Sequence, residues 1–150
     1  MAHVSLSEHV EAPIERVFAL LIDFKRYPEW DVTTAEVLEI SGPGDKVGTK
    51  IHMVGLLLGR KMENRGEIVE ADPPRLLKMA VQEPSRGTIT YRLTPAGTST
   101  DVTVEMEYEL PGILGEIANK LFAERFIERA MRHSGENVKA LVEAEAHVSV

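Results

Sequence analysis

The sequence predicts an α+β fold in which seven antiparallel strands form a sheet and a long helix ends the chain. Residues 101–110 alternate apolar and polar side chains without a break, which is typical of a strand with one buried and one wet face. Residues 88–94 alternate in the same way, and the Gly-containing turn at 94–98 joins the two strands as an antiparallel hairpin. From Gly112 onward the apolar spacing becomes helical.

The N-terminal part predicts one strand, over 3–10, and two short helices. Pro13 suits the first turn of a helix, because its missing N–H would be unpaired there in any case. Pro28 then discourages further helix, since the residue before a proline is pushed out of the α region. Trp30, the only tryptophan, lies just past that break. One helical face is apolar at i, i+3, i+4 and i+7: Ile14, Val17, Phe18 and Leu21.

The middle of the chain predicts four further strands, at 33–40, 49–57, 60–70 and 75–83. Turn-rich segments separate them, rich in glycine, proline, serine and aspartate. Together with the hairpin, this arrangement places Tyr91 and Tyr108 on one face of the sheet.

In the C-terminal helix, every fourth residue from Leu114 to Val142 is apolar except Ser134. A row of this spacing advances about 40° around the helix axis per step, so the buried face is expected to rotate along the helix. A helix laid across a strongly twisted sheet would need this rotation, and a kink near Glu124 would also explain it. Gly135 is a second weak point, because a mid-helix glycine costs about 1 kcal/mol relative to alanine.

The rotation predicts two roles along this helix. We expect its later half, with Val138 and Leu141, to anchor the helix to the sheet. We expect its early half to cover a pocket as a lid, through Leu114, Ile117, Leu121 and Phe122.

Composition limits the classes of protein that remain. A length of 150 residues with 43% hydrophobic content predicts one domain spanning 1–150. The absence of cysteine excludes disulfides, thiolate metal sites and cysteine nucleophiles. The net charge of −7 argues against binding to nucleic acid or to an anionic membrane surface. The sequence shows no signal-like start and no apolar run long enough to cross a bilayer, so we expect no transmembrane segment and a cytoplasmic location.

Motifs of metal, phosphate and nucleophile sites are missing or lie in the wrong context. Gly42, Pro43 and Gly44 resemble a phosphate loop, but such loops precede a helix and here a strand follows, so a hairpin loop is the better interpretation. The five histidines lack tight ligand spacing, and no Gly-x-Ser-x-Gly motif occurs. We therefore expect no cofactor, no metal and no covalent catalysis.

The order of the motifs resembles the START-like (SRPBCC) ligand-binding superfamily, in its polyketide cyclase/dehydrase-like branch. The resemblance covers nearly all of the chain. Its matching features are the helix start at Pro13 with Val17 and Phe18, the pair Asp23-Phe24, the run Tyr27-Pro28-Glu29-Trp30, the strand opening at Gly48-Thr49, the turns at 72–75 and 94–98, and the long helix. The resemblance implies a helix-grip fold (START-like, Bet v 1-like), in which a curved sheet folds around the C-terminal helix and leaves a hydrophobic pocket between them.

The strand and helix faces supply the candidate ligand-binding residues. Each of them could instead be core packing, but tyrosine and tryptophan carry a donor that needs a partner when buried, and methionine adapts to irregular ligands. The candidates are Trp30, Met53, Tyr91, Leu93, Met106, Tyr108, Leu114, Ile117, Leu121 and Phe122. The resemblance adds Asn64 and Arg65, on a strand that lines the pocket in the family. Ile68 stands where cyclases carry an arginine, and this departure weakens an enzyme interpretation.

These observations predict non-covalent binding, for carriage or sensing, of a hydrophobic small molecule such as a lipid, isoprenoid or polyketide-like compound. The first alternative is a polyketide aromatase/cyclase or dehydratase, for which Tyr91, Tyr108, Glu63 and Arg65 are the proton-transfer candidates.

The second alternative is a protein-interaction module that uses the apolar hairpin tip at Leu56, Leu57 and Leu58. For this tip a buried strand end is the preferred interpretation. A pocket rim, a homodimer contact or an edge that touches lipid are the others.

Overall fold

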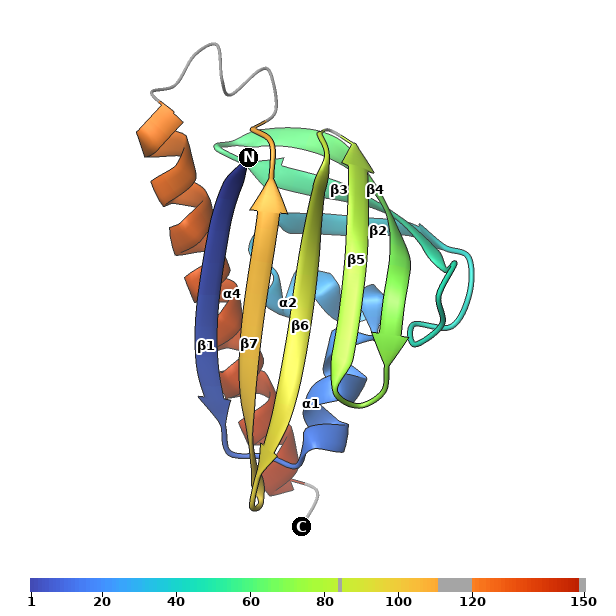
Figure 1. Ribbon diagram of the computed structural model, residues 1–150, viewed down its shortest axis with the longest axis vertical. Coiled ribbons are helices and arrows are strands. Elements are labelled where there is room, and N and C mark those ends of the chain that lie inside the picture. The colour runs from blue at the N-terminus through green and yellow to red at the C-terminus, as the bar shows by residue number, and fades with distance from the viewer. Residues whose placement is uncertain (84, 111–119, 149–150) are drawn as a thin grey trace.

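The chain folds into a seven-stranded antiparallel sheet that curves around a long helix (Figure 1). This computed structural model describes residues 1–83, 85–110 and 120–148. The strands are β1 (Ala2–Val10), β2 (Thr34–Ile40), β3 (Lys50–Leu57), β4 (Arg60–Asp72), β5 (Leu76–Glu83), β6 (Gly87–Ala96) and β7 (Ser99–Tyr108). Their spatial order is β1-β7-β6-β5-β4-β3-β2, so β1 and β2 form the two edges of the sheet. The strand periodicity therefore predicted the sheet correctly.

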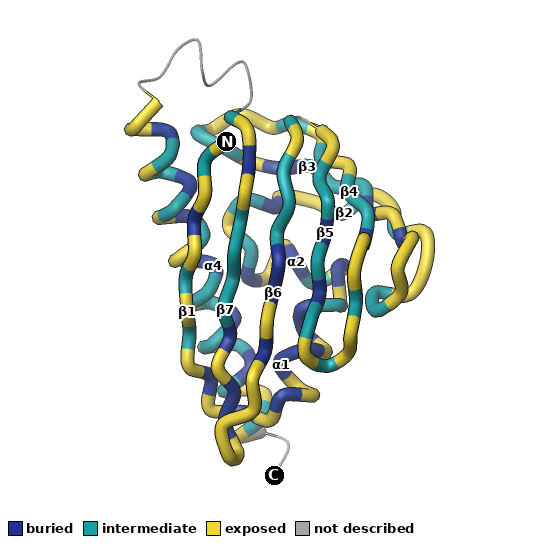
Figure 2. Tube along the Cα trace, viewed as in Figure 1, coloured by how far each residue is buried: buried dark blue, intermediate teal, exposed yellow. Residues whose placement is uncertain are grey.

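The hairpin of β6 and β7 is the regular centre of the sheet. The two strands pair without a shift, from Gly87 opposite Tyr108 to Ala96 opposite Ser99. Tyr91 and Tyr108 both point to the inner face and are buried, as the alternation predicts. In Figure 2, buried positions alternate with more exposed ones along β6 and β7.

Irregular pairing at the other side of the sheet bends it. Register shifts occur in β2 between Thr34 and Glu36 and in β4 between Ile68 and Glu70. Such bulges increase the local twist and bend a strand. In Figure 1, β2 and β3 accordingly run across the inner side of the longer strands and close one end of the fold.

Three short helical segments connect β1 to β2. The first, α1 (Ile14–Leu21), begins after Pro13 and buries its apolar face, as predicted. A 3-10 turn, η1 (Phe24–Arg26), leads into α2 (Tyr27–Trp30). The expectation that Pro28 ends helical structure is wrong. Pro28 lies in the first turn of α2, where its missing N–H breaks no helical hydrogen bond, and Trp30 ends this helix.

The C-terminal helix, α4 (Lys120–Val148), packs against β1, α1 and α2. Its buried residues step by three or four positions along one face: Ala123, Ile127, Ala130, Ser134, Val138 and Val142. From Ala130 to Val142 each step is four residues, which exceeds the helical repeat of 3.6. The buried face therefore rotates along this part of the helix, as expected. Glu124 and Gly135 both lie inside this continuous helix.

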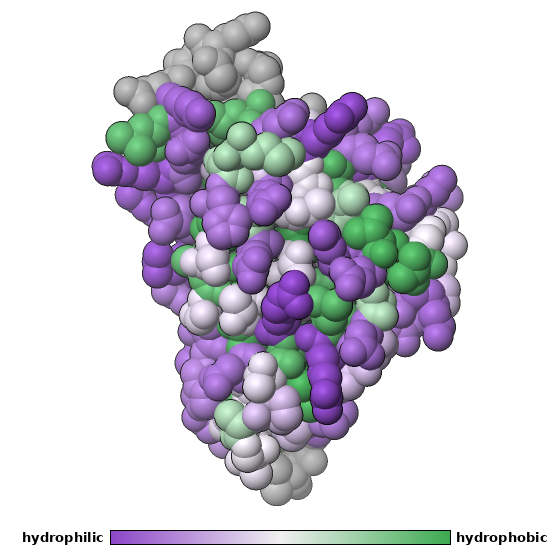
Figure 3. Space-filling view, viewed as in Figure 1, coloured by the Kyte–Doolittle hydropathy of each residue, from purple (hydrophilic) through white to green (hydrophobic). Residues whose placement is uncertain are grey.

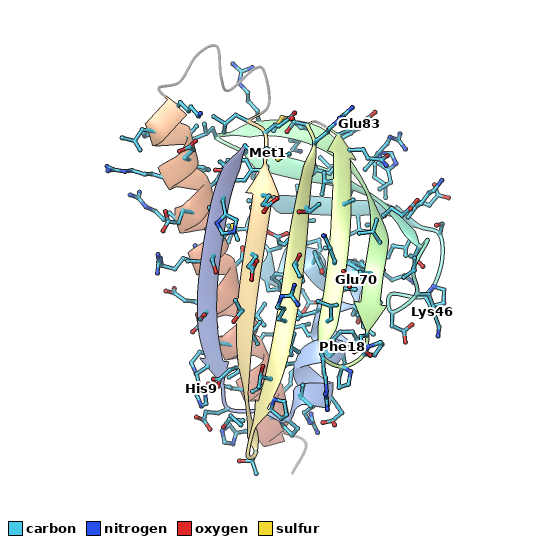
Figure 4. The ribbon with its side chains drawn as sticks, in the orientation of Figure 1. Met1, His9, Phe18, Lys46, Glu70 and Glu83 are labelled. Atoms are coloured by element: carbon cyan, nitrogen blue, oxygen red, sulfur yellow. The ribbon has the colours of Figure 1, made fainter. Side chains whose placement is uncertain are left out.

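Polar side chains cover the outer face of the sheet. Figure 3 shows this face as largely hydrophilic, and Figure 4 shows exposed side chains such as Glu70 and Glu83 projecting from the strands, whereas Phe18 lies on α1 beneath them. Among the described helices, none is long and apolar enough to cross a membrane.

Candidate ligand-binding cavity

A cavity of about 270 Å³ lies between the inner face of the sheet and α4. It separates the apolar interior into two clusters. One contains Val10, Tyr91 and Val102, together with α1 and the C-terminal half of α4. The other contains Tyr108 and Ile127, together with Met106 and Met131. Residues of both clusters line the cavity, so the sheet and helix enclose a space that their side chains do not fill.

Five of the ten predicted ligand-binding residues line this cavity: Trp30, Met53, Tyr91, Met106 and Tyr108. Leu93 does not line it. Leu93 is buried in the core cluster shared with α1, because β6 extends beyond the cavity toward that helix.

The two described residues of α4 that were predicted to form a lid do not line the cavity. Leu121 and Phe122 are 54% and 58% exposed, because the buried face of the helix passes through Ala123 and Ile127 instead. Leu114 and Ile117 lie outside the described residues. The middle of α4 lines the cavity instead, through Ile127, Met131, Ser134, Gly135 and Val138. Of these, Val138 was expected only to anchor the helix.

Two aromatic rings from the β1–β2 connection, Tyr27 and Trp30, line one wall of the cavity, and Phe24 packs against Tyr27. Tyr27 stacks at a tilt between Phe24, at a ring distance of 4.9 Å, and Trp30, at 4.5 Å. The Tyr27 hydroxyl donates a hydrogen bond of 2.7 Å to the carbonyl of Leu21. Because α2 is so short, these ring contacts and this hydrogen bond hold Trp30 against the cavity.

Tyr91 faces this wall from β6. Burial raises the pKa of the Tyr91 hydroxyl, and the nearby Asp31 carboxylate raises it further. Burial also raises the pKa of Tyr108. Both phenols therefore stay protonated at neutral pH, which makes them hydrogen-bond donors rather than proton acceptors.

Two buried donors in the cavity wall lack a partner among the residues that the structure describes. They are the indole Nε1 of Trp30 and the hydroxyl of Tyr108. Trp30 is 4% exposed and Tyr108 is 6% exposed. A buried donor without a partner costs about 1–3 kcal/mol, so each of these groups requires an acceptor that the described residues do not supply.

Asp31 lies at the cavity but is engaged in local structure. Its carboxylate accepts hydrogen bonds from the Thr33 backbone at 3.0 Å and from the Thr33 and Thr34 hydroxyls at 2.8 Å. The Ser134 hydroxyl donates to the same carboxylate at 3.4 Å. These contacts connect the start of β2 to α4.

A family model described as polyketide cyclase/dehydrase and lipid transport matches residues 1–143. The chain belongs to the polyketide cyclase/dehydrase and lipid transport family. Among curated proteins, no sequence matches it significantly.

Solved structures share this family's helix-grip fold at low sequence identity. A START superfamily protein from Mycobacterium smegmatis aligns with a TM-score of 0.75 and 17% identity, over 95% of this chain and 97% of that chain. The Zhui aromatase/cyclase from Streptomyces sp. R1128 aligns with a TM-score of 0.70 and 18% identity, over 97% and 93%. The di-domain ARO/CYC StfQ from the steffimycin biosynthetic pathway aligns with a TM-score of 0.72 and 15% identity, over 98% of this chain and 51% of that chain. At these identities the similarity concerns the fold.

Three of the four proton-transfer candidates suggested for a cyclase line the cavity of this family member, Tyr91, Tyr108 and Arg65, whereas Glu63 does not. The Arg65 side chain is half exposed and forms ion pairs with Glu63 at 3.6 Å and Glu83 at 3.4 Å. Glu63 is itself exposed and also lies 3.3 Å from His52. Alternation along β4 instead turns Asn64 inward, where it lines the cavity. Ile68, which stands at the position of the cyclase arginine, is fully buried core.

The absence of a side chain at Gly55 leaves room for the Asn64 side chain on the inner face of the sheet. A Cβ at position 55 would collide with the Asn64 amide nitrogen, so the absence of a side chain there is what lets the amide lie against β3. Asn64 pairs across from Met53, and both line the cavity.

The apolar hairpin tip forms part of the cavity rim. Leu56 and Leu57 line the cavity, and Leu56 is 39% exposed. Leu58 and Gly59 adopt positive φ angles of 51° and 78° in the tight turn that follows. The preferred interpretation as a buried strand end is therefore wrong, and the pocket-rim alternative matches the structure.

Several cavity residues escaped the sequence analysis. The most informative is Glu8, whose position on the strand has the same parity as Val4, Leu6 and Val10. A carboxylate in an otherwise apolar row of a strand indicates a polar group facing the interior, and the sequence alone shows this row. Ser134, Gly135, Ile127 and Met131 could not be identified in this way, because the side of α4 that faces the cavity depends on how the helix crosses the sheet. No group of His, Asp or Glu suited to a metal ion occurs in the described part of the chain.

Proposed function

We propose that this protein binds one compact hydrophobic small molecule in the cavity between the sheet and α4. The observation that carries the proposal is a mainly apolar cavity whose walls hold two buried donors, Trp30 Nε1 and the Tyr108 hydroxyl, that have no partner among the described residues. Such a site combines an apolar surface for affinity with a few polar groups for orientation. Burial of apolar ligand surface would supply about 25 cal/mol per Å² before ordering costs.

The size of the cavity favours a compact ligand. Its volume of about 270 Å³ lies at the lower end of ligand pockets. A one- or two-ring isoprenoid or polyketide-like compound suits this space better than a two-chain phospholipid does. The membership of the family, which includes lipid transport in its description, supports the same class of ligand.

Thermal shift and isothermal titration across a library of compact apolar compounds test the proposal. A ligand that binds only the folded state raises the melting temperature by mass action. Trp30 is the only tryptophan in the chain, so its fluorescence reports directly on the cavity wall. If no compound shifted the melting temperature or changed this fluorescence, and the cavity proved to be filled by side chains in a crystal structure, the proposal would be wrong.

A matched pair of variants locates the binding in the cavity. Met106→Trp should fill space between the sheet and α4 and abolish binding, because Met106 lines the cavity from β7. Val69→Trp adds the same ring at an exposed position of β4 and should leave binding unchanged. Equal binding by both variants would place the ligand elsewhere on the protein.

A further inference from the structure

We propose that Glu8 selects ligands that carry a hydrogen-bond donor, a hydroxyl or an amine, on their apolar body. This inference rests on the proposed binding function and adds the polar chemistry of the ligand. It assigns a recognition role to a carboxylate on the inner face of β1.

The position of Glu8 is set by the strand. On β1 the inward positions are held by Val4, Leu6 and Val10, and Glu8 occupies the fourth place in this row. Across the sheet Glu8 pairs with Val102 of β7, which is 5% exposed. Glu8 itself is only partly exposed and lines the cavity. An ionised carboxylate among valine and leucine side chains is costly unless something bonds to it.

The other acidic and basic groups near the cavity already have partners or lie at its rim. Asp31 accepts from Thr33 and Thr34, and Arg65, which is half exposed, pairs with Glu63 and Glu83. Arg86 and Glu109 are exposed at the rim. For the Glu8 carboxylate, the described residues supply no hydrogen bond or ion pair. Carboxylate oxygens accept hydrogen bonds, so a ligand group that pairs with Glu8 must be a donor.

Gly135 keeps the approach to this carboxylate open. If a Cβ is built on Gly135 of α4, the nearest atom to it is Oε2 of Glu8, at 3.7 Å. Any side chain longer than that of alanine would cover the carboxylate from the helix side. The glycine thus leaves the oxygen available to a molecule in the cavity, although it weakens the helix.

The polar groups of the cavity together define the class of ligand. Trp30 Nε1 and the Tyr108 hydroxyl require an acceptor, and Glu8 requires a donor. A phenol, an alcohol on a ring system, or a hydroxylated cyclic ketone supplies both on an apolar frame. A pure hydrocarbon or a fatty-acid carboxylate lacks the donor that Glu8 requires, and the carboxylate would in addition be repelled by Glu8.

Two probes of nearly equal size test the inference: 2-naphthol, which has a donor, and 2-methoxynaphthalene, which has only an acceptor. Calorimetric titration at neutral pH should show that the wild-type protein prefers 2-naphthol by about tenfold, the effect of one hydrogen bond to a charged group. In Glu8→Leu this preference should vanish through weaker binding of 2-naphthol, with 2-methoxynaphthalene unchanged. Leucine suits this position, because Leu6 already occupies the same inward row.

Glu107→Gln is the matched control. It removes one negative charge from an exposed position of β7, so it should retain the wild-type preference. Equal affinity of both probes for the wild type, or a preference that persists in Glu8→Leu, would overturn the role of Glu8 while the cavity remained a binding site. If neither probe bound the wild-type protein, both the proposed function and this inference would fail.

Discussion

The hydroxyl of Ser134 on α4 accepts a hydrogen bond of 3.1 Å from the backbone N–H of Val32. This contact explains why a serine interrupts the apolar row of the helix. The neighbouring turn of α4 makes a second contact of the same kind, in which the Asn137 amide donates 3.1 Å to the carbonyl of Trp30. The two bonds tie the helix to the short segment that carries Trp30 into the cavity wall.

Ser134→Ala should lower the free energy of unfolding by about 1 kcal/mol, because the Val32 N–H loses its acceptor. Chemical denaturation of both proteins measures this difference. His133→Ala, at the preceding and exposed position of α4, is the control and should change stability little. Equal stability of Ser134→Ala and the wild type would show that water replaces the serine hydroxyl without loss.

Tyr108→Phe and Tyr27→Phe delete the same hydroxyl group with opposite expected effects. The Tyr108 hydroxyl is buried without a described partner, so its removal should leave the unliganded protein equally stable or up to about 1 kcal/mol more stable, and should weaken ligand binding. The Tyr27 hydroxyl bonds to the Leu21 carbonyl, so its removal should cost roughly 0.5–1.5 kcal/mol. Denaturant midpoints and ligand titrations on both variants separate these roles. A clear loss of stability in Tyr108→Phe would indicate a partner for its hydroxyl.

Leu141→Ala and Phe122→Ala test which part of α4 is buried. Leu141 packs against the main core cluster, so its truncation should cost about 2 kcal/mol, the lower end of the range for leucine to alanine. Phe122 is 58% exposed, and its truncation should cost less than about 1 kcal/mol. Ligand affinity should change little in Phe122→Ala. A strong effect of Phe122→Ala on binding would restore the lid role first expected for this part of the helix.

Gly135→Ala should stabilise the protein by up to about 1 kcal/mol, because alanine favours the helix and its Cβ meets Glu8 Oε2 at an ordinary contact distance of 3.7 Å. Gly97→Ala is the contrasting variant. Gly97 has a φ of 66°, which strains an L-residue, so this change should destabilise by about 1 kcal/mol. Thermal unfolding measures both. A loss of stability in Gly135→Ala would mean that the helix and β1 have no room for a methyl group.

His9 predicts a pH dependence of stability near neutrality. Hydrogen bonds to Asp101 at 2.7 Å and Glu11 at 2.9 Å raise the pKa of His9 above its ordinary value of 6.5. Protonation of His9 therefore stabilises the folded state, and this contribution is fully present at pH values below the pKa of His9 in the unfolded chain. This contribution is lost as the pH rises through the higher folded pKa.

The difference in stability between the wild type and His9→Gln should accordingly shrink as the pH rises from 6.5 through the raised pKa of His9 in the folded protein. Denaturation series at several pH values measure this difference, and an NMR titration of the His9 ring gives the folded pKa. The pKa of Glu11 is lowered below its ordinary value of 4.5 by its hydrogen bonds to Ser99 and His9, so this carboxylate does not titrate in the same range. A difference that did not vary with pH would contradict the assigned role of His9.

The sequence predicted the strands well because each of them has one wet face. In β7, for example, Val102 and Tyr108 are buried whereas Asp101 and Glu107 are exposed, and this local alternation is readable without any tertiary contact. The same reasoning was wrong for the early part of α4. There, apolar residues at helical spacing allowed two different buried faces, and only packing against β1 selected the face of Ala123 and Ile127.

By itself, then, the sequence determined the α+β class, the strand boundaries to within two residues and the position of α1. It also determined that Tyr91 and Tyr108 share a face. It could do so because the periodicity of apolar residues indicates which side of each element is buried. Only the tertiary structure decided which buried residues face a cavity and which face the core. Leu93 and Tyr91 are two positions apart on one strand face, yet one packs on α1 and the other lines the cavity. Glu8 and Gly135 are far apart in sequence, and the crossing of α4 over β1 alone brings them together. Burial is a property of each element, whereas a cavity is a property of how several elements fail to fill the space between them.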